Sequence, residues 1–310
     1  MLPEQIAEAR MKRYNGTVLS IAKTHSDLMV MRVRSDFLRP PHIPGQYCTL
    51  GLGNWEPRMP GCQDDNLKPE DEAKVVRRAY SISCSVLSEK HELLDIATTD
   101  YLEFYIVLVR ENLNGRPPAL TPRLFMLNPG DRLAIGEKIT GHYTLESVKE
   151  GDNVIFLGTG TGEAPHNYML WDLLHRGHQG KILSASCVRY RRDLGYLAIH
   201  QKLEQRYPNY KYLPLATRET DTVAHKVYIQ DLITSGQMQE YLGAPLDPAH
   251  THVFLCGNPK MIGVPVKNAE TGAREYPKTV GVIQLLEERG FKTDNNAQKF
   301  KGNVHFEEYW

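Results

Sequence analysis

The chain has few cysteines, and their spacing fits neither a metal centre nor a disulfide framework. Its 310 residues include five cysteines, an odd number, and none of them form a C-x-x-C pair. Zinc and iron–sulfur sites need closely spaced thiols, and secreted disulfide scaffolds need paired ones. The sequence therefore predicts no metal site and favours a reducing compartment such as the cytoplasm. The cysteines are Cys48, Cys62, Cys84, Cys187 and Cys256.

The chain also has no excess of positive or negative charge, and it has no long apolar run. Lys and Arg number 37, and Asp and Glu number 37, so the formal net charge is zero. A neutral chain does not attract nucleic acid or an anionic membrane through bulk charge. No apolar run approaches the roughly 18 residues that span a bilayer, and no secretion signal opens the chain. We expect a soluble, unprocessed, monomeric protein that binds neither nucleic acid nor membrane.

The length and the first pattern of elements predict two domains. A chain of 310 residues exceeds the roughly 150 residues of a usual domain. Between residues 15 and 145, short strand-like segments alternate with turn residues such as Pro44 and Gly45, without a helical period. We therefore expect an antiparallel β-barrel over residues 1–147. Residues 51–74, rich in Gly, Pro, Asp and Glu, predict a surface insertion in it.

After residue 147 the pattern changes to strands that alternate with helices, which predicts a parallel sheet with right-handed crossovers. The second domain is thus an α/β domain over residues 148–310. Its expected strands are residues 154–157, 181–184, 210–213, 253–256 and 304–306. Its helices are expected to begin near Pro165, Asp193, Tyr228, Lys260 and Thr279.

A glycine-rich turn follows the first strand of the second domain. It consists of Gly158, Thr159, Gly160, Thr161 and Gly162. Glycines allow the backbone to approach a pyrophosphate, and the helix that follows offers N–H groups with a partial positive charge. The turn therefore predicts dinucleotide binding. The alternative is a tight turn that needs glycine for steric reasons alone.

Basic residues at the ends of the next two strands indicate which dinucleotide binds. NAD-specific sheets usually place a carboxylate at the end of the second strand, but this chain has Arg189 there and Arg218 after the third strand. Guanidinium groups match a phosphate in fork geometry. We predict that Arg189 and Arg218, with Lys226 as a helper, bind the 2′-phosphate of NADP(H). Arg191 and Arg192 fit solvated surface charges equally well.

A second glycine turn, Cys256-Gly257-Asn258-Pro259, closes the fourth strand. Ligands bind at the carboxyl edge of open parallel sheets, so Cys256 and Gly257 are candidates for contact with the nicotinamide ring. The alternative for Cys256 is a small buried residue, which is the usual environment of a free cysteine.

These motifs, together with Arg78-Ala79-Tyr80-Ser81 and the terminal Tyr309-Trp310, resemble the ferredoxin–NADP+ reductase family, most closely its bacterial branch that ends in Tyr-Trp. The resemblance extends from about Tyr14 to Trp310. It implies FAD in the β-barrel, NADP(H) in the α/β domain and an oxidoreductase. Such an enzyme transfers hydride between NADP(H) and flavin N5, and single electrons to or from ferredoxin or flavodoxin.

The resemblance also implies the residues that hold FAD. Arg78 would neutralise the pyrophosphate, Tyr80 would pack on the flavin and Ser81 would bond N5, with Ala79 between the first two in the motif. Further contacts are implied for Tyr105, Val107, Thr121 and Thr144.

The implied catalytic group is Ser81, Cys256, Tyr309 and Trp310. Trp310 is the preferred ring to cover the flavin until a nicotinamide displaces it, and Tyr309 is the alternative. Glu307 or Glu308 is a further candidate for proton delivery, unless both are exposed charges at the chain end.

Two other functions fit parts of the sequence. An NAD(P)H-dependent flavin reductase or an oxygenase reductase would use the same domains. Many oxygenase reductases carry an additional iron–sulfur module, but this chain has no cluster of cysteines that could bind one. A non-catalytic cofactor sensor would not need a hydride path. The choice between ferredoxin and flavodoxin stays open. Basic residues that could face an acidic partner, or be scattered surface charge, are Arg77, Arg123 and Lys138.

Overall fold

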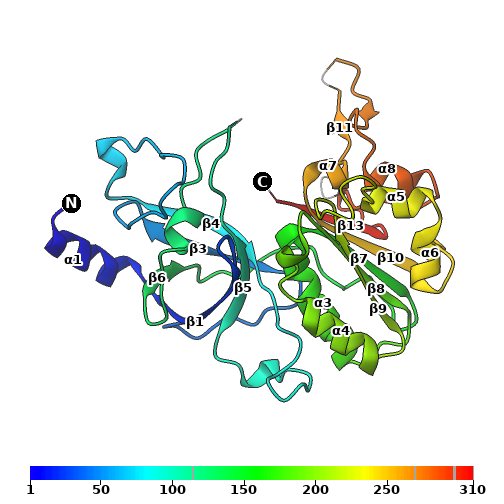
Figure 1. Cartoon of the computed structure of the whole chain (residues 1–310), viewed down its shortest axis with the longest axis horizontal. Coiled ribbons are helices and arrows are strands. Elements are labelled where there is room, and N and C mark those ends of the chain that lie inside the picture. The colour runs from blue at the N-terminus through cyan, green and yellow to red at the C-terminus, as the bar shows by residue number, and fades with distance from the viewer. Residues whose placement is uncertain (114, 269, 296–297, 310) are drawn as a thin grey trace. The chain divides into compact units, whose positions relative to one another are not determined.

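The computed structural model describes residues 1–113, 115–268, 270–295 and 298–309 (Figure 1). The chain divides into two compact units. Unit 1 comprises Met1–Cys84 and Asp95–His142, and unit 2 comprises Ser85–Leu94 and Tyr143–Trp310. The second unit thus begins before the expected boundary at residue 148 and includes an earlier segment. The reason is burial, because Val86, Leu87 and Tyr143 pack in one hydrophobic cluster with the strands of unit 2.

Unit 1 is built on six antiparallel strands in the order β4-β3-β6-β1-β2-β5. Neighbours pair antiparallel throughout, and the buried residues of the strands include Val18, Met31, Leu50 and Phe104. The predicted antiparallel N-terminal fold is confirmed. The strands are β1 (Gly16–His25), β2 (Leu28–Ser35), β3 (Tyr47–Gly53), β4 (Val75–Ser81), β5 (Leu102–Val107) and β6 (Arg132–Ile135).

The stretch expected as an insertion begins later than the composition suggested. Strand β3 continues to Gly53, and Leu52 is fully buried, so residues 51–53 belong to the sheet. Their glycines reflect close packing, since a Cβ on Gly53 would lie 2.1 Å from the ring of Trp55. The insertion is therefore residues 54–74.

Unit 1 also contains two α-helices. Helix α1 (Pro3–Arg13) has no buried residue and was not predicted, while α2 (Thr121–Leu124) is a single turn. Arg10 of α1 donates from its Nε to Oε1 of Glu56 in the insertion, and these two atoms lie 2.8 Å apart. The helix is thus attached to unit 1 by a polar contact.

Unit 2 contains a five-stranded parallel sheet in the order β13-β10-β7-β8-β9, which confirms the predicted α/β fold. Its two faces are covered by different helices: α3 and α4 contribute to one hydrophobic cluster, and α5 to α8 contribute to the other (Figure 1). The strands are β7 (Asn153–Thr159), β8 (Ile182–Val188), β9 (Tyr210–Ala216), β10 (Thr251–Gly257) and β13 (Val304–Glu308). The helices are α3 (Glu163–His175), α4 (Leu197–Arg206), α5 (Ile229–Thr234), α6 (Gln237–Leu242), α7 (Pro259–Ile262) and α8 (Val282–Glu287).

Helix starts in unit 2 differ from the expected ones in two places. The helix expected near Asp193 begins at Leu197, because the Asp193 carboxylate instead accepts from the Tyr190 N–H, 3.0 Å away, in a preceding short turn. The helix expected near Thr279 begins at Val282. Residues 264–278 include a small hairpin of β11 (Val266–Lys267) and β12 (Arg274–Glu275). None of the helices in the described part of the chain is long and apolar enough to cross a membrane.

Candidate functional site

The glycine-rich turn lies at the carboxyl edge of the parallel sheet, between β7 and α3. Residues Gly160–Gly162 form one tight turn, and Gly160 has φ +56°. A Cβ on Gly162 would lie 2.2 Å from the carbonyl oxygen of Cys256. The first N–H groups of α3 lack partners within the helix, as at every helix start. Gly162 is therefore packed against the second turn, whereas a Cβ on Gly160 would meet no described atom within 4 Å, so the backbone at Gly160 is open in the way that a pyrophosphate requires.

The second glycine turn packs directly on the first. Asn258 donates its backbone N–H to Thr159 Oγ1, 2.7 Å away. Gly257 has φ +120°, and a Cβ there would lie 2.3 Å from the same hydroxyl oxygen. The ends of β7 and β10 thus meet closely, with the Thr159 hydroxyl between them and no room for a side chain at Gly257. The structure brings together the two turns that the sequence predicted as dinucleotide contacts.

Arg189 and Arg218 lie side by side at the ends of β8 and β9. Arg218 donates its backbone N–H to the carbonyl oxygen of Arg189 over 2.8 Å. Both side chains are exposed, as is that of Lys226, and none of the three has an ion pair with a carboxylate in the described part of the chain. These cations remain available to a phosphate.

Arg191 and Arg192, close by, are already engaged. Arg191 forms an ion pair with Asp221 at 2.5 Å, and Arg192 lies over the ring of Tyr190, 5.0 Å from its centroid. Arg191 and Arg192 therefore have local partners, whereas Arg189 and Arg218 have no carboxylate partner within the described ranges. The sequence alone did not distinguish these two pairs.

Strand β13 places the chain end beside Cys256. Cys256 is opposite Glu307 in the parallel register, and Gly257 is opposite Glu308. Tyr309 packs against the hydrophobic cluster that contains Cys256, which has no exposed surface. Burial, with Glu307 nearby, raises the pKa of the Cys256 thiol well above its ordinary value, so the thiol stays protonated at neutral pH. Trp310 lies outside the described residues.

The Arg78–Ser81 tetrapeptide forms the end of β4. Arg78 is exposed, Tyr80 is half-buried, and Ser81 is buried with 5% of its surface accessible. Ala79 lies opposite Thr49 of β3. Tyr80 meets Phe104 edge to face, with ring centroids 6.5 Å apart.

The other expected FAD residues have varied environments. Tyr105 on β5 is buried, whereas Val107 at the end of the same strand is 41% exposed. Thr121 accepts a hydrogen bond from the Val109 N–H over 3.2 Å, which ties α2 to the end of β5. Thr144, which belongs to unit 2, is 4% exposed, and its hydroxyl has no hydrogen-bond partner within the described ranges. A buried hydroxyl of this kind fits a ligand contact.

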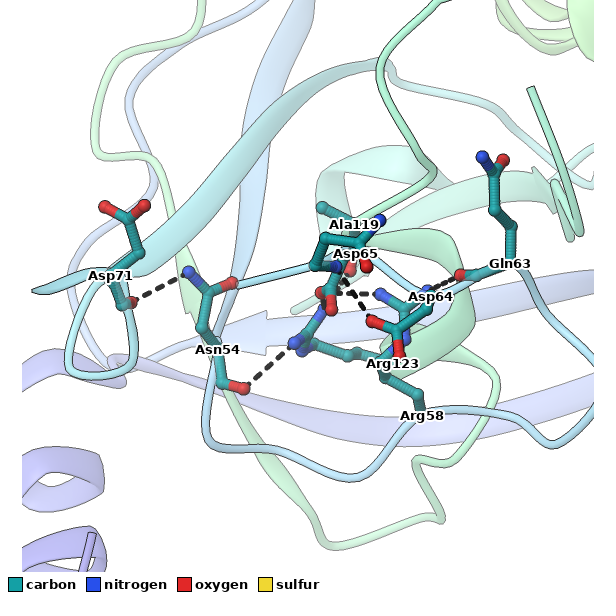
Figure 2. Close-up of polar contacts among 9 residues, drawn as sticks. Asn54, Arg58, Gln63, Asp64, Asp65, Asp71, Ala119 and Arg123 are labelled. Carbon is teal, nitrogen blue, oxygen red and sulfur yellow. Dashed lines mark hydrogen bonds and ion pairs between the residues drawn. The ribbon is translucent and has the colours of Figure 1, made fainter. Parts of the chain in front are cut away.

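Arg123 neither faces a partner protein nor is a surface charge, so both interpretations that the sequence left open for it are wrong. Only 1% of its side chain is exposed, and Figure 2 shows it among polar groups of the insertion. It pairs with Asp65 at 2.8 Å and donates to the carbonyl oxygens of Asn54 and Ala119. Arg123 therefore anchors residues 54–74 inside unit 1. Arg77 and Lys138 are exposed.

The family model for the oxidoreductase NAD-binding domain matches residues 156–267, which cover the turn and both arginines. Among solved structures, a ferredoxin NADP+ reductase from Neisseria gonorrhoeae with bound FAD and NADP has a similar fold. Its TM-score is 0.67 at 19% sequence identity, and the match covers 95% of this chain and 97% of that chain.

Characterised relatives are similar over most of the sequence. The flavodoxin/ferredoxin–NADP reductase of Escherichia coli is 28% identical over 248 residues, 80% of this chain and 86% of the relative. Ferredoxin–NADP reductase A of Sorangium cellulosum is 31% identical over 264 residues, 82% of this chain and 76% of the relative. The chain belongs to the flavodoxin/ferredoxin–NADP reductase family of oxidoreductases.

Proposed function

We propose that this chain transfers hydride between NADP(H) and a bound FAD, and passes electrons singly to or from a ferredoxin or flavodoxin. The observation that carries the proposal is the junction of two glycine-containing turns, where the Asn258 N–H donates to the Thr159 hydroxyl, on the same sheet edge as two exposed arginines. Such an edge offers one surface to a pyrophosphate and another to a 2′-phosphate.

In this proposal the second unit binds NADP(H). Backbone N–H groups of the Gly158–Gly162 turn and of the start of α3 hold the pyrophosphate. Arg189 and Arg218 hold the 2′-phosphate, and Lys226 adds positive charge. Support comes from their exposure and from the lack of competing carboxylates within the described ranges. Guanidinium forks favour phosphate over the 2′-hydroxyl of NAD(H), so the site selects NADP(H).

FAD supplies the redox chemistry when bound, because its ring accepts a hydride and releases electrons one at a time. Residues 1–147 provide most of its site. Arg78 neutralises its pyrophosphate, Tyr80 packs on the ring and Ser81 donates near N5. Exposed Arg78 and Val107 and the unpartnered hydroxyl of Thr144 support this assignment. The remaining contacts are Ala79, Tyr105 and Thr121.

The C-terminus acts as a gate in this proposal. Tyr309 covers Cys256, and Trp310 occupies the nicotinamide position until the nicotinamide displaces it. The Cys256 thiol, which has no exposed surface while Tyr309 packs beside it, contacts the nicotinamide once both terminal aromatic residues move aside, and it does so as a neutral group, since burial keeps it protonated. Glu307 or Glu308 exchanges protons with solvent. The packing of Tyr309 against the cluster that contains Cys256 supports the gate.

We place this activity in the cytoplasm and assign it to a monomer. The five cysteines are unpaired, which fits a reducing compartment. Stopped-flow mixing of the NADPH-reduced protein with oxidised ferredoxin, flavodoxin or free FMN tests the acceptor. Faster reduction of one of the two proteins than of FMN is expected. Faster reduction of free FMN would favour a flavin reductase instead.

A further inference from the structure

The first residue of α3 is a buried carboxylate that the proposed mechanism does not use. Glu163 is only 3% exposed and follows the glycine turn directly. Its Oε1 accepts from the hydroxyl of Ser186 on β8 at 2.9 Å and from the hydroxyl of Tyr212 on β9 at 3.0 Å. One oxygen atom therefore joins the start of the helix to two neighbouring strands.

A histidine from a fourth element completes this cluster. His200 of α4 is 1% exposed, and its Nε2 lies 2.9 Å from Glu163 Oε1, in close contact but without the geometry of a hydrogen bond. Its Nδ1 lies 2.7 Å from the hydroxyl of Tyr210, and its ring stacks on Tyr212 with centroids 4.0 Å apart. Burial and the Glu163 carboxylate raise the pKa of Tyr212 well above its ordinary value, so this hydroxyl keeps its proton and donates.

Stability alone does not account for such a cluster. A buried ionic group costs desolvation energy, and apolar residues of similar size are often equally stabilising in its place. The carboxylate instead fixes the position of the helix, because its directional hydrogen bonds hold the start of α3 in one place on the two strands. Ser186 is opposite Gly158 in the sheet register, and Arg189 follows the same strand. Tyr212 lies on the strand that leads to Arg218.

We propose that Glu163 is a positioning residue that sets the spacing between the phosphate-binding turn and the two arginines. It joins the start of α3, next to Gly162 at the end of the turn, to β8 and β9, the strands that precede Arg189 and Arg218. The cluster thereby fixes the distance between the pyrophosphate site and the 2′-phosphate site, so that one NADP(H) molecule reaches both. This inference rests on the proposed function.

The test compares two ligands on the FAD-loaded protein by calorimetric titration. NADP+ engages both sites, whereas 2′-AMP engages only the arginines. Glu163→Leu, which removes the hydrogen bonds, is expected to weaken NADP+ about tenfold, because the two sites no longer act together. Its affinity for 2′-AMP should change by no more than about twofold, since the arginines are unaltered.

Glu163→Gln is the matched control, because its amide oxygen still accepts from Ser186 and Tyr212. This variant should bind NADP+ with an affinity within about threefold of that of the wild type. If Glu163→Gln weakens NADP+ binding as much as Glu163→Leu does, or if Glu163→Leu weakens the binding of both ligands equally, the positioning role is wrong.

Should Glu163→Leu fail to fold, Tyr212→Phe decides the question: a selective loss of NADP+ affinity supports the inference, and unchanged affinity overturns it. Wild-type protein that bound neither ligand would contradict the proposed function, and the inference with it.

Discussion

Tyr309 donates its backbone N–H to the carbonyl oxygen of Gly257, 2.9 Å away. This bond extends the pairing of β13 with β10 by one residue and holds the chain end against the second glycine turn. The penultimate residue is thus attached to the sheet edge. The attachment keeps Tyr309 beside the turn that we propose contacts the nicotinamide.

Removal of Trp310 is therefore expected to tighten NADP+ binding about tenfold, or about 1.4 kcal/mol, and to slow turnover through slower release. The measurement is the Kd from titration of the flavin absorbance, together with kcat. Tyr309→Phe keeps the ring and the backbone bond and serves as the control. Unchanged Kd and kcat in the truncated chain would contradict the gate.

Arg218→Ala is expected to weaken NADPH by about 1.5–3 kcal/mol, the range for a hydrogen bond to a charged group, and to leave NADH nearly unchanged. The values of kcat/KM for the two donors provide the measurement. Arg191→Ala is the control, because Arg191 is paired with Asp221 and should lose little. Equal losses for both donors would disprove 2′-phosphate recognition by Arg218.

Asp65→Asn is expected to destabilise the protein by about 3–5 kcal/mol, because it leaves the buried Arg123 guanidinium without its counter-charge. Urea unfolding followed by circular dichroism measures the change. Lys74→Ala removes an exposed partner of Asp71 and should cost less than about 1 kcal/mol. If both variants cost the same, the ion pair seen in Figure 2 does not anchor the insertion.

The buried side chain of His166 is expected to make the free energy of unfolding depend on pH. Burial lowers the pKa of His166 to about 3, whereas an unfolded histidine titrates near about 6.5. Because the unfolded chain binds the proton first, His166 makes stability fall as the pH drops from about 6.5 towards 3, by about 1.4 kcal/mol per unit. Its Nε2 lies 2.7 Å from the Tyr143 hydroxyl, so His166→Gln keeps a polar partner there. Urea unfolding between pH 4 and 7 should show a shallower slope for the variant, and an identical slope would refute this origin.

Features set by local sequence were predictable. The strand before Gly158, the turn itself and the strand–helix alternation follow from neighbouring residues, and the parallel sheet follows from that alternation. Helix α1 was missed although Pro3 and Glu4 in its first turn and basic residues in its last turn were readable signals.

Features that depend on distant partners were not predictable. Arg123 fits surface charge until Asp65, from the insertion, pairs with it. Glu163 stands out in the sequence only as an acidic residue after five small ones, and its partners Ser186, His200 and Tyr212 come from three other elements. The segment Ser85–Leu94 joins unit 2 through the burial of Val86 and Leu87, which no local pattern indicates.

The most direct test of the account is an anaerobic titration of the purified, FAD-loaded protein with NADPH and, separately, with NADH, followed by the visible absorbance of the flavin. We expect NADPH to bleach the yellow colour at near-stoichiometric amounts, and NADH to require a large excess. A colourless protein that does not take up added FAD, or a bound flavin that neither nucleotide reduces, would contradict the account.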